Sequence, residues 1–136
     1  MVNPEYQWLP GPVGEMLRGA SLATTARIPL TSALVVTTGH VGVDLKTGKL
    51  VTESPTAEFN AIFDCLDAAL KNAGVSKGLA KAHKLVAYMT DAKYEATILE
   101  IFRKRYPGNT PTLTSVVVGL VNPGVHAEIQ AEAISD

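Results

Sequence analysis

Apolar residues along this chain follow two different periods, and the change from one to the other marks the expected strands and helices. Residues 33–39 and 83–89 are rich in β-branched and aromatic side chains, so each is predicted to form a strand. Between residues 56 and 72 the apolar positions recur in steps of three and four, which predicts a helix with one apolar face. Those positions are Phe59, Ile62, Phe63, Leu66, Ala69 and Leu70. The same spacing predicts a second helix over residues 92–106.

Capping and turn residues set the expected ends of these elements. Ser54 and Thr56 are both N-cap candidates, and Ser54 would place Pro55 at the first helical position, which proline tolerates. Gly74 is predicted to end the first helix as its C′ residue. Asp44 begins and Gly48 ends a predicted turn. Residues 17–22 are ambiguous and are interpreted as a short strand.

The last third of the chain is predicted to form two strands, residues 112–121 and 125–134, around an Asn-Pro-Gly turn. The final strand alternates strictly: Ala127 and Ile129 lie on the face expected under the helices, and Glu128 lies on the other face. The preceding strand has no polar face. Leu113, Ser115 and Val117 share one side of it, and the other side is also largely apolar. Two helices cover only one face of a sheet, so we expect a second subunit to cover the other.

The predicted order is strands, helix, strand, helix and two strands, which indicates an α+β fold with both helices on one face of a mostly antiparallel sheet. Residues 1–14 contain three prolines and are interpreted as an N-terminal arm that Tyr6 and Trp8 pin to a neighbouring surface. Residues 15–136 are expected to form a single domain, which suits the length of 136 residues.

Composition and charge exclude several classes of function. The formal net charge is −1 and no run of Lys or Arg occurs, so a nucleic-acid partner is not expected. Cys65 is the only cysteine, which rules out an internal disulfide, and no Cys/His cluster suggests a metal. No stretch approaches 18 apolar residues and no secretory signal is evident, so we expect a cytoplasmic protein without membrane contact. The glycines do not have the spacing of a phosphate-binding loop, and no cofactor is expected.

Several segments, taken in order, resemble the RidA family, also called YjgF or L-PSP proteins. They are Val36-Thr37-Thr38-Gly39-His40, the Asp44 to Gly48 turn, Ala68 to Val75, Val86 to Asp91, the strand that Pro111 begins, and Val125 to Ile129. Together the resemblance covers about residues 11–134. It implies a chorismate-mutase-like fold and a homotrimer with pockets between subunits. It also implies hydrolysis of reactive enamines and imines, such as 2-aminoacrylate, to a keto acid and ammonia.

The resemblance also implies site residues, and this chain departs from the family's pattern at some of them. Family members carry an arginine two residues after the proline, which clamps a substrate carboxylate, and a glutamate fifteen residues later. Pro111 and Glu128 match, but Leu113 stands where the arginine is expected, and no Arg or Lys follows Pro111. Met16 stands near the position of a family tyrosine, and His40 stands where a glutamine is usual.

The candidate catalytic residues are Glu128, as an acid or base in an interface cleft, and His40, as a proton shuttle near neutral pH. The candidate substrate-binding residues are Met16, Thr38, Gly39, Tyr88, Leu113 and Ser115. A solvated strand glutamate and a backbone-bonded histidine are the ordinary alternatives for the catalytic pair. His126 is interpreted as a surface histidine that shares the face of Glu128, His83 as a surface residue without a role, and Cys65 as a buried, inert thiol.

These residues lead to three functional hypotheses. Leucine cannot hold a carboxylate as a guanidinium does, so the first is a cofactor-independent small-molecule enzyme acting on a neutral, rather apolar substrate, in specialised metabolism. Its acid/base chemistry would be imine or enamine hydrolysis, tautomerisation or a related step. The second is a non-catalytic trimer that binds a ligand or a partner. The weakest is a generic 2-imino-acid deaminase or an endoribonuclease-type relative.

Overall fold

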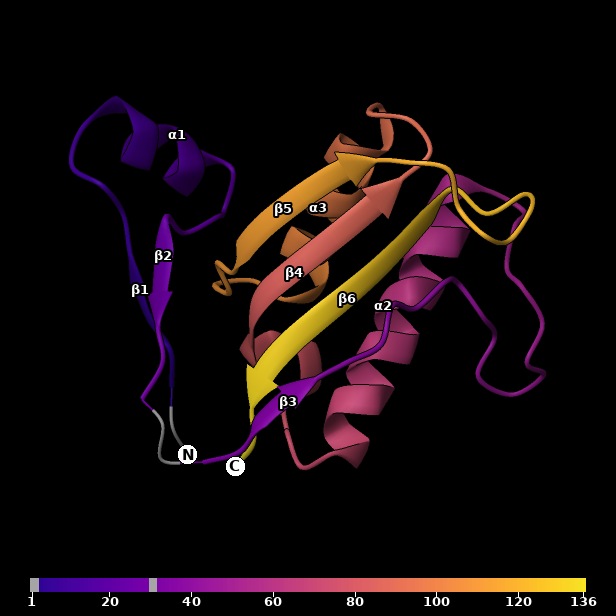
Figure 1. The fold of residues 1–136 in the computed structure, drawn as a ribbon, viewed down its shortest axis with the longest axis horizontal. Coiled ribbons are helices and arrows are strands. Elements are labelled where there is room, and N and C mark those ends of the chain that lie inside the picture. The colour runs from indigo at the N-terminus through magenta and orange to yellow at the C-terminus, as the bar shows by residue number, and fades with distance from the viewer. Residues whose placement is uncertain (1–2, 30–31) are drawn as a thin grey trace.

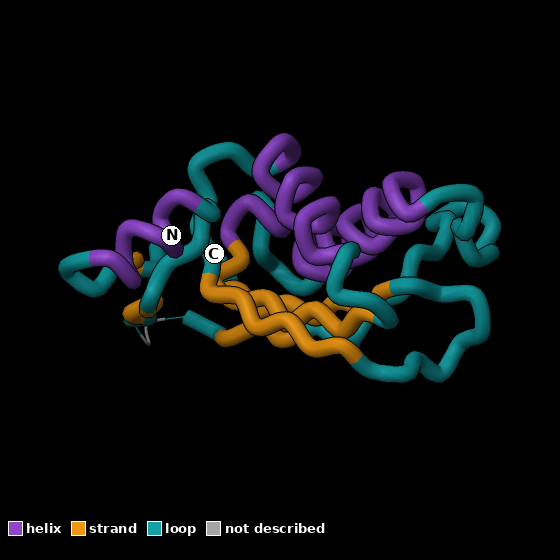
Figure 2. Tube along the Cα trace, turned by 90° about the horizontal axis from the view of Figure 1, so that it is seen from above, coloured by secondary structure: helices purple, strands orange, loops and turns teal. Residues whose placement is uncertain are grey.

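A computed structural model describes residues 3–29 and 32–136, and helices cover one face of its main sheet while the other face is open (Figure 2). In chain order the elements are β1 (Glu5–Gln7), α1 (Pro12–Gly19), β2 (Thr25–Arg27), β3 (Leu34–Val36), α2 (Pro55–Asn72), the 3-10 helix η1 (Gly78–Lys81), β4 (Ala82–Met89), α3 (Tyr94–Arg105), β5 (Thr112–Val117) and β6 (Ala127–Ile134). The expected α+β class is confirmed.

The main sheet has the strand order β3-β6-β4-β5, and Figure 1 shows α2 and α3 behind it. β6 pairs antiparallel with both β3 and β4, whereas β4 and β5 run parallel. The parallel pair is possible because α3 carries the chain back across the sheet between these two strands. Antiparallel pairing therefore predominates, as the sequence predicted, and β4 and β6 form the centre.

Helix α2 follows its predicted signals closely. The Ser54 hydroxyl accepts a 3.1 Å hydrogen bond from the Ala57 amide, so Ser54 rather than Thr56 is the N-cap, and Pro55 is the first helical residue. Gly74, with φ at 98°, follows the C-terminal Ala73 as the C′ residue. The apolar face of the helix is buried against the sheet in a core that includes Phe59, Ile62, Phe63, Leu66, Leu70, Leu85, Ala87, Ile129 and Ala131.

The segment between β3 and α2 forms an irregular hairpin beside α2. The Asp44 carboxylate accepts hydrogen bonds from the Lys46 and Thr47 amides, which closes the predicted turn. Cys65, on α2, is buried, and its thiol donates a 3.2 Å hydrogen bond to the Val43 carbonyl oxygen. This contact fastens the hairpin to the helix.

The N-terminal region forms a separate β1-β2 pair whose two strands flank α1, outside the main sheet (Figure 1). The predicted strand over residues 17–22 is wrong, because α1 extends to Gly19 and begins with Pro12 in its first turn. Tyr6 docks this region as expected: its hydroxyl lies 3.1 Å from the Ala82 carbonyl oxygen and 3.0 Å from Asn109 Oδ1. Trp8 instead stays within the region and donates to the Leu22 carbonyl oxygen.

Among the described helices, none combines the length and the apolar character needed to cross a membrane.

Candidate functional site

The open face of the sheet carries Glu128, because β6 alternates between the two faces. Ala127 and Ile129 are buried under the helices, so Glu128 between them points the other way. Its carboxylate lies against Gly39: a Cβ built on that glycine would be 2.6 Å from Glu128 Oε2. A side chain at this position would displace the end of the Glu128 side chain, so glycine leaves room for the carboxylate.

His40 is held next to Glu128 by the backbone of β6. The His40 amide donates to the Ile129 carbonyl oxygen at 2.9 Å, and the Ile129 amide donates to the His40 carbonyl oxygen at 3.0 Å. Burial lowers the pKa of His40 below its ordinary value, and the negative charge of Glu128 offsets part of that decrease. The imidazole is therefore neutral near pH 7 and can accept a proton close to a carboxylate.

Tyr88 and Thr38 complete this group, which we call the Glu128 cluster and define as Thr38, Gly39, His40, Tyr88 and Glu128. Tyr88 is the β4 residue paired with Glu128 in the antiparallel register, so the two side chains share the open face. Thr38 is exposed and directly precedes Gly39. Five of the residues that the sequence singled out thus lie together.

The other expected binding residues lie elsewhere in the single chain. Leu113 pairs with Leu85 and Ser115 pairs with Ala87, both buried under the helices, so both residues face the helices rather than Glu128. Leu113 packs against the core, and the Ser115 hydroxyl is buried without a hydrogen-bond partner among the described residues. The expected cleft between Leu113 and Glu128 is absent from the described part of one chain, because the two residues lie on opposite faces.

Met16 is also separate from the Glu128 cluster. It lies on α1, which Figure 1 places outside the main sheet, and 66% of its surface is exposed. Two cavities of the chain are lined by other residues: one lies under the N-terminal arm and one lies between the hairpin and α2. Neither cavity is lined by a residue of the Glu128 cluster.

Sequence reasoning missed the most deeply buried charged group, Glu58 on α2. It is 1% exposed, and its carboxylate accepts hydrogen bonds from the His126 amide at 2.7 Å, from the Ala127 amide at 3.2 Å and from His126 Nδ1 at 2.7 Å. The His126 side chain is 35% exposed, as expected of a surface histidine, but its ring contacts Glu58 and meets the Tyr94 ring edge-on instead of sharing the face of Glu128. The sequence did contain a signal for this burial. Glu58 lies four residues before Ile62, so the two side chains share the apolar side of the helix.

His83 also differs from its expected surface position. It is 5% exposed, at a bulge in β4 between Ala82 and Lys84, and its Nε2 lies 3.4 Å from Glu132 Oε2. Burial lowers the pKa of His83, while the hydrogen bond and charge of Glu132 counteract part of the shift. Neither this cluster nor any other group of His, Cys, Asp and Glu within residues 3–29 and 32–136 has the arrangement of a metal site.

The arrangement of the Glu128 cluster supports proton transfer. The Glu128 carboxylate forms no salt bridge and no hydrogen bond within the described residues, and it lies against Gly39, beside the neutral imidazole of His40. A carboxylate and an imidazole at one edge can remove a proton from water and deliver one to a leaving group. The open face around them is mixed: Leu34, Val36 and Val116 are exposed on it, and Lys84, Gln130 and Glu132 share it.

Comparison with known proteins adds three findings. The model of the family described as endoribonuclease L-PSP matches residues 25–135. No curated protein matches the sequence. Solved structures with the same fold include the conserved Rid-family protein YyfB from Yersinia pestis, at 18% identity, covering 97% of this chain and 98% of that one, with a TM-score of 0.79.

Two further structures agree with this fold. A probable translation initiation inhibitor from Rhodopseudomonas palustris is 25% identical, covers 98% of this chain and 94% of that one, and has a TM-score of 0.69. The YjgF gene product from E. coli is 23% identical over 80% of this chain and 85% of that one, with a TM-score of 0.66.

Proposed function

Because this chain belongs to the endoribonuclease L-PSP family, the group that includes the RidA and YjgF proteins, we propose that it is a cofactor-independent enzyme for a small, neutral and rather apolar substrate. The observation that carries the proposal is the Glu128 carboxylate, which packs against Gly39 beside the neutral imidazole of His40. The proposed substrate class is supported by the exposed Val36 and Val116 on the sheet face of Glu128, and by the pairing of Lys84, a cation on that face, with Glu132 at 3.9 Å.

The reaction proposed is hydrolysis of an imine. Glu128 accepts a proton from water as the water oxygen attacks the imine carbon, and the imine nitrogen takes a proton from solvent. Glu128 then returns its proton to the nitrogen of the carbinolamine, His40 accepts the hydroxyl proton, and the carbon–nitrogen bond breaks to release the neutral amine. His40 gives its proton back to solvent, so that one imine and one water give one carbonyl compound and one amine.

We propose that the site is completed in a homotrimer. The open sheet face exposes Leu34 and Val36 at 52% and 55%, which favours cover by another copy of the chain. A subunit placed there would exclude water from the Glu128 cluster and strengthen its electrostatic interactions. The oligomer is part of the proposal, and its mass in sedimentation equilibrium tests it. We propose no nucleic-acid substrate, since the net charge is −1.

The decisive experiment compares two substrates on the purified protein. A neutral aryl ketimine should be hydrolysed faster than in buffer, and a 2-imino acid should be hydrolysed much more slowly than the ketimine. Glu128→Gln should lower kcat at least about 100-fold, which is the contribution typical of an acid/base group. Gln130→Ala is the matched control, since Gln130 follows on the same face of β6 and should have little effect.

Two results would contradict the proposal. Rapid hydrolysis of the 2-imino acid would show that a carboxylate is accepted without the arginine. Full activity in Glu128→Gln would show that this carboxylate has no role. A trimer that hydrolyses neither compound would support the non-catalytic alternative, in which the family fold is kept for binding.

A further inference from the structure

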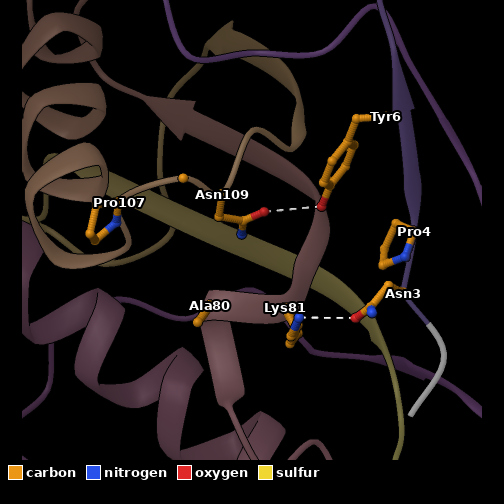
Figure 3. A pocket seen from close by; sticks show the side chains of 8 residues that line it. Asn3, Pro4, Tyr6, Ala80, Lys81, Pro107 and Asn109 are labelled. Atoms are coloured by element: carbon orange, nitrogen blue, oxygen red, sulfur yellow. Dashed lines mark hydrogen bonds between the residues drawn. The ribbon is translucent and has the colours of Figure 1, made fainter.

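A cavity lies under the N-terminal arm, away from the Glu128 cluster (Figure 3). Its volume is about 280 Å³, close to the lower end of the range for small-molecule pockets. The arm supplies one side and the start of β4 with the α3–β5 connection supplies the other. The lining residues are Asn3, Pro4, Tyr6, Ala80, Lys81, Pro107, Gly108 and Asn109. We call this space the arm cavity.

The arm cavity is cationic, because Lys81 is its one residue that is charged at neutral pH and no Asp or Glu lines it. Its ammonium donates an exposed 2.9 Å hydrogen bond to Asn3 Oδ1, a neutral acceptor, and forms no salt bridge within the described residues. An ammonium carries three N–H donors, so two remain for another acceptor. An ammonium that has no carboxylate partner favours an anionic ligand.

The remaining polar groups of the arm cavity are already occupied. Asn109 is 9% exposed; its Nδ2 donates to the carbonyl oxygens of Leu79 at 3.0 Å and Ala82 at 2.9 Å, and its Oδ1 accepts from the Tyr6 hydroxyl. Burial raises the pKa of Tyr6 to about 12, so its hydroxyl remains protonated and adds no negative charge. Lys81 is therefore the group with free donors.

The lining is mixed, and its apolar side chains, Pro4, Ala80 and Pro107, bound the space left for the body of a ligand. Figure 3 shows Pro4 on the arm side and Pro107 and Ala80 on the opposite side. Two rigid rings facing a small space suit a compact hydrocarbon body better than a highly hydrated group. One ammonium balances one negative charge, so a dianion such as phosphate would remain undercompensated.

We propose that the arm cavity is a binding site for a small organic monocarboxylate, whose carboxylate accepts hydrogen bonds from Lys81 and whose apolar body lies between Pro4 and Pro107. This site is distinct from the Glu128 cluster and does not depend on the function proposed for it. Since Asn3, Pro4 and Tyr6 belong to the arm, an occupied cavity also fixes the arm against the domain.

The test uses benzoate and its neutral isostere benzamide as probes of the full-length chain, followed by amide proton–nitrogen NMR spectra. Benzoate should shift the amide signals of Lys81, Gly108 and Asn109 in a saturable way, and benzamide should bind at least about tenfold more weakly, because a charge-assisted bond is lost. Lys81→Gln should weaken benzoate binding by a similar factor. Lys49→Gln, an exposed lysine on the hairpin, should leave it unchanged.

A second variant keeps the charge of Lys81 and fills the arm cavity. Ala80→Leu should abolish benzoate binding while the spectrum retains the dispersion of a folded chain. Equal binding of both probes, undiminished binding in Lys81→Gln, or shifts confined to Gly39 and His40 would overturn the proposal. Ketimine hydrolysis should be unaffected in Lys81→Gln, so failure of this site and failure of the Glu128 cluster give different results.

Discussion

The Glu58 carboxylate on α2 lies 2.7 Å from Nδ1 of His126, immediately before β6, and also accepts the amide protons of His126 and Ala127. One buried side chain thereby joins the first turn of the long helix to the start of the central strand. Since the carboxylate can only accept, this geometry places a proton on His126 Nδ1. This contact at His126, two residues before Glu128, positions the strand that carries Glu128.

Replacing Glu58 should destabilise the fold strongly. Glu58→Ala leaves two backbone amides and the imidazole without their acceptor in a buried place, so we expect the free energy of unfolding to fall by about 3–5 kcal/mol. Urea denaturation followed by circular dichroism measures this loss. Glu100→Ala is the control, because Glu100 forms an exposed pair with Lys104 on α3 and its removal should change stability very little. Equal effects of the two substitutions would contradict the role of Glu58.

Removing the charge of Glu128 should lower the pKa of His40 further. The carboxylate raises that pKa against the larger effect of burial, so Glu128→Gln removes a contribution that favours the protonated ring. An NMR titration of the His40 ring proton measures the change without any substrate. Glu132→Gln is the control: it lies on the same face of β6 but next to His83, so it should lower the pKa of His83 instead. An unchanged His40 titration in Glu128→Gln would show that the two groups do not interact.

A methyl group at Gly39 should disturb the site more than the fold. In Gly39→Ala the new Cβ would overlap the end of the Glu128 side chain, which can rotate away, so ketimine hydrolysis should fall while thermal stability changes little. Gly119→Ala, where a Cβ meets only open space, should alter neither. If Gly39→Ala lowered stability and left activity unchanged, glycine would be required at this position by the backbone and not by the Glu128 carboxylate.

Acidification should unfold the protein partly through His83. Its pKa in the folded chain is lowered, so between that value and the ordinary value of about 6.5 the unfolded chain binds more protons. Stability is therefore fully present above about pH 6.5 and decreases as the pH falls through this window. His40 acts in the same direction. The free energy of unfolding, measured between pH 7 and 5, should depend less steeply on pH in His83→Gln, and an unchanged slope would contradict this account.

The parts of the fold that local signals determine could be predicted from the sequence. Ser54 and Gly74 bound α2 because capping depends on neighbouring residues, and the alternation around Glu128 gives its face because strand geometry has a period of two. The α1 helix was missed since its two glycines, Gly14 and Gly19, weaken helical propensity. Gly14 is required by close contact with the Leu9 backbone, which only the folded arm reveals.

The candidate site could be predicted only in part, because strand pairing depends on distant segments. Gly39, His40 and Glu128 meet through the bridge between His40 and Ile129. The face of Leu113 depends on the parallel register with Leu85, which nothing in residues 112–117 specifies alone. The burial of Glu58 likewise depends on donors that β6 brings from 68 residues away.

The single cysteine gives this chain a natural chemical reporter. Because the Cys65 thiol is buried and donates to the Val43 carbonyl oxygen, a thiol reagent can reach it only when the hairpin over α2 separates from the helix. The rate of labelling under native conditions therefore measures the opening of residues 43–51, and a Cys65→Ser chain supplies the unlabelled reference. Local opening can thus be timed in the natural sequence, without an introduced probe.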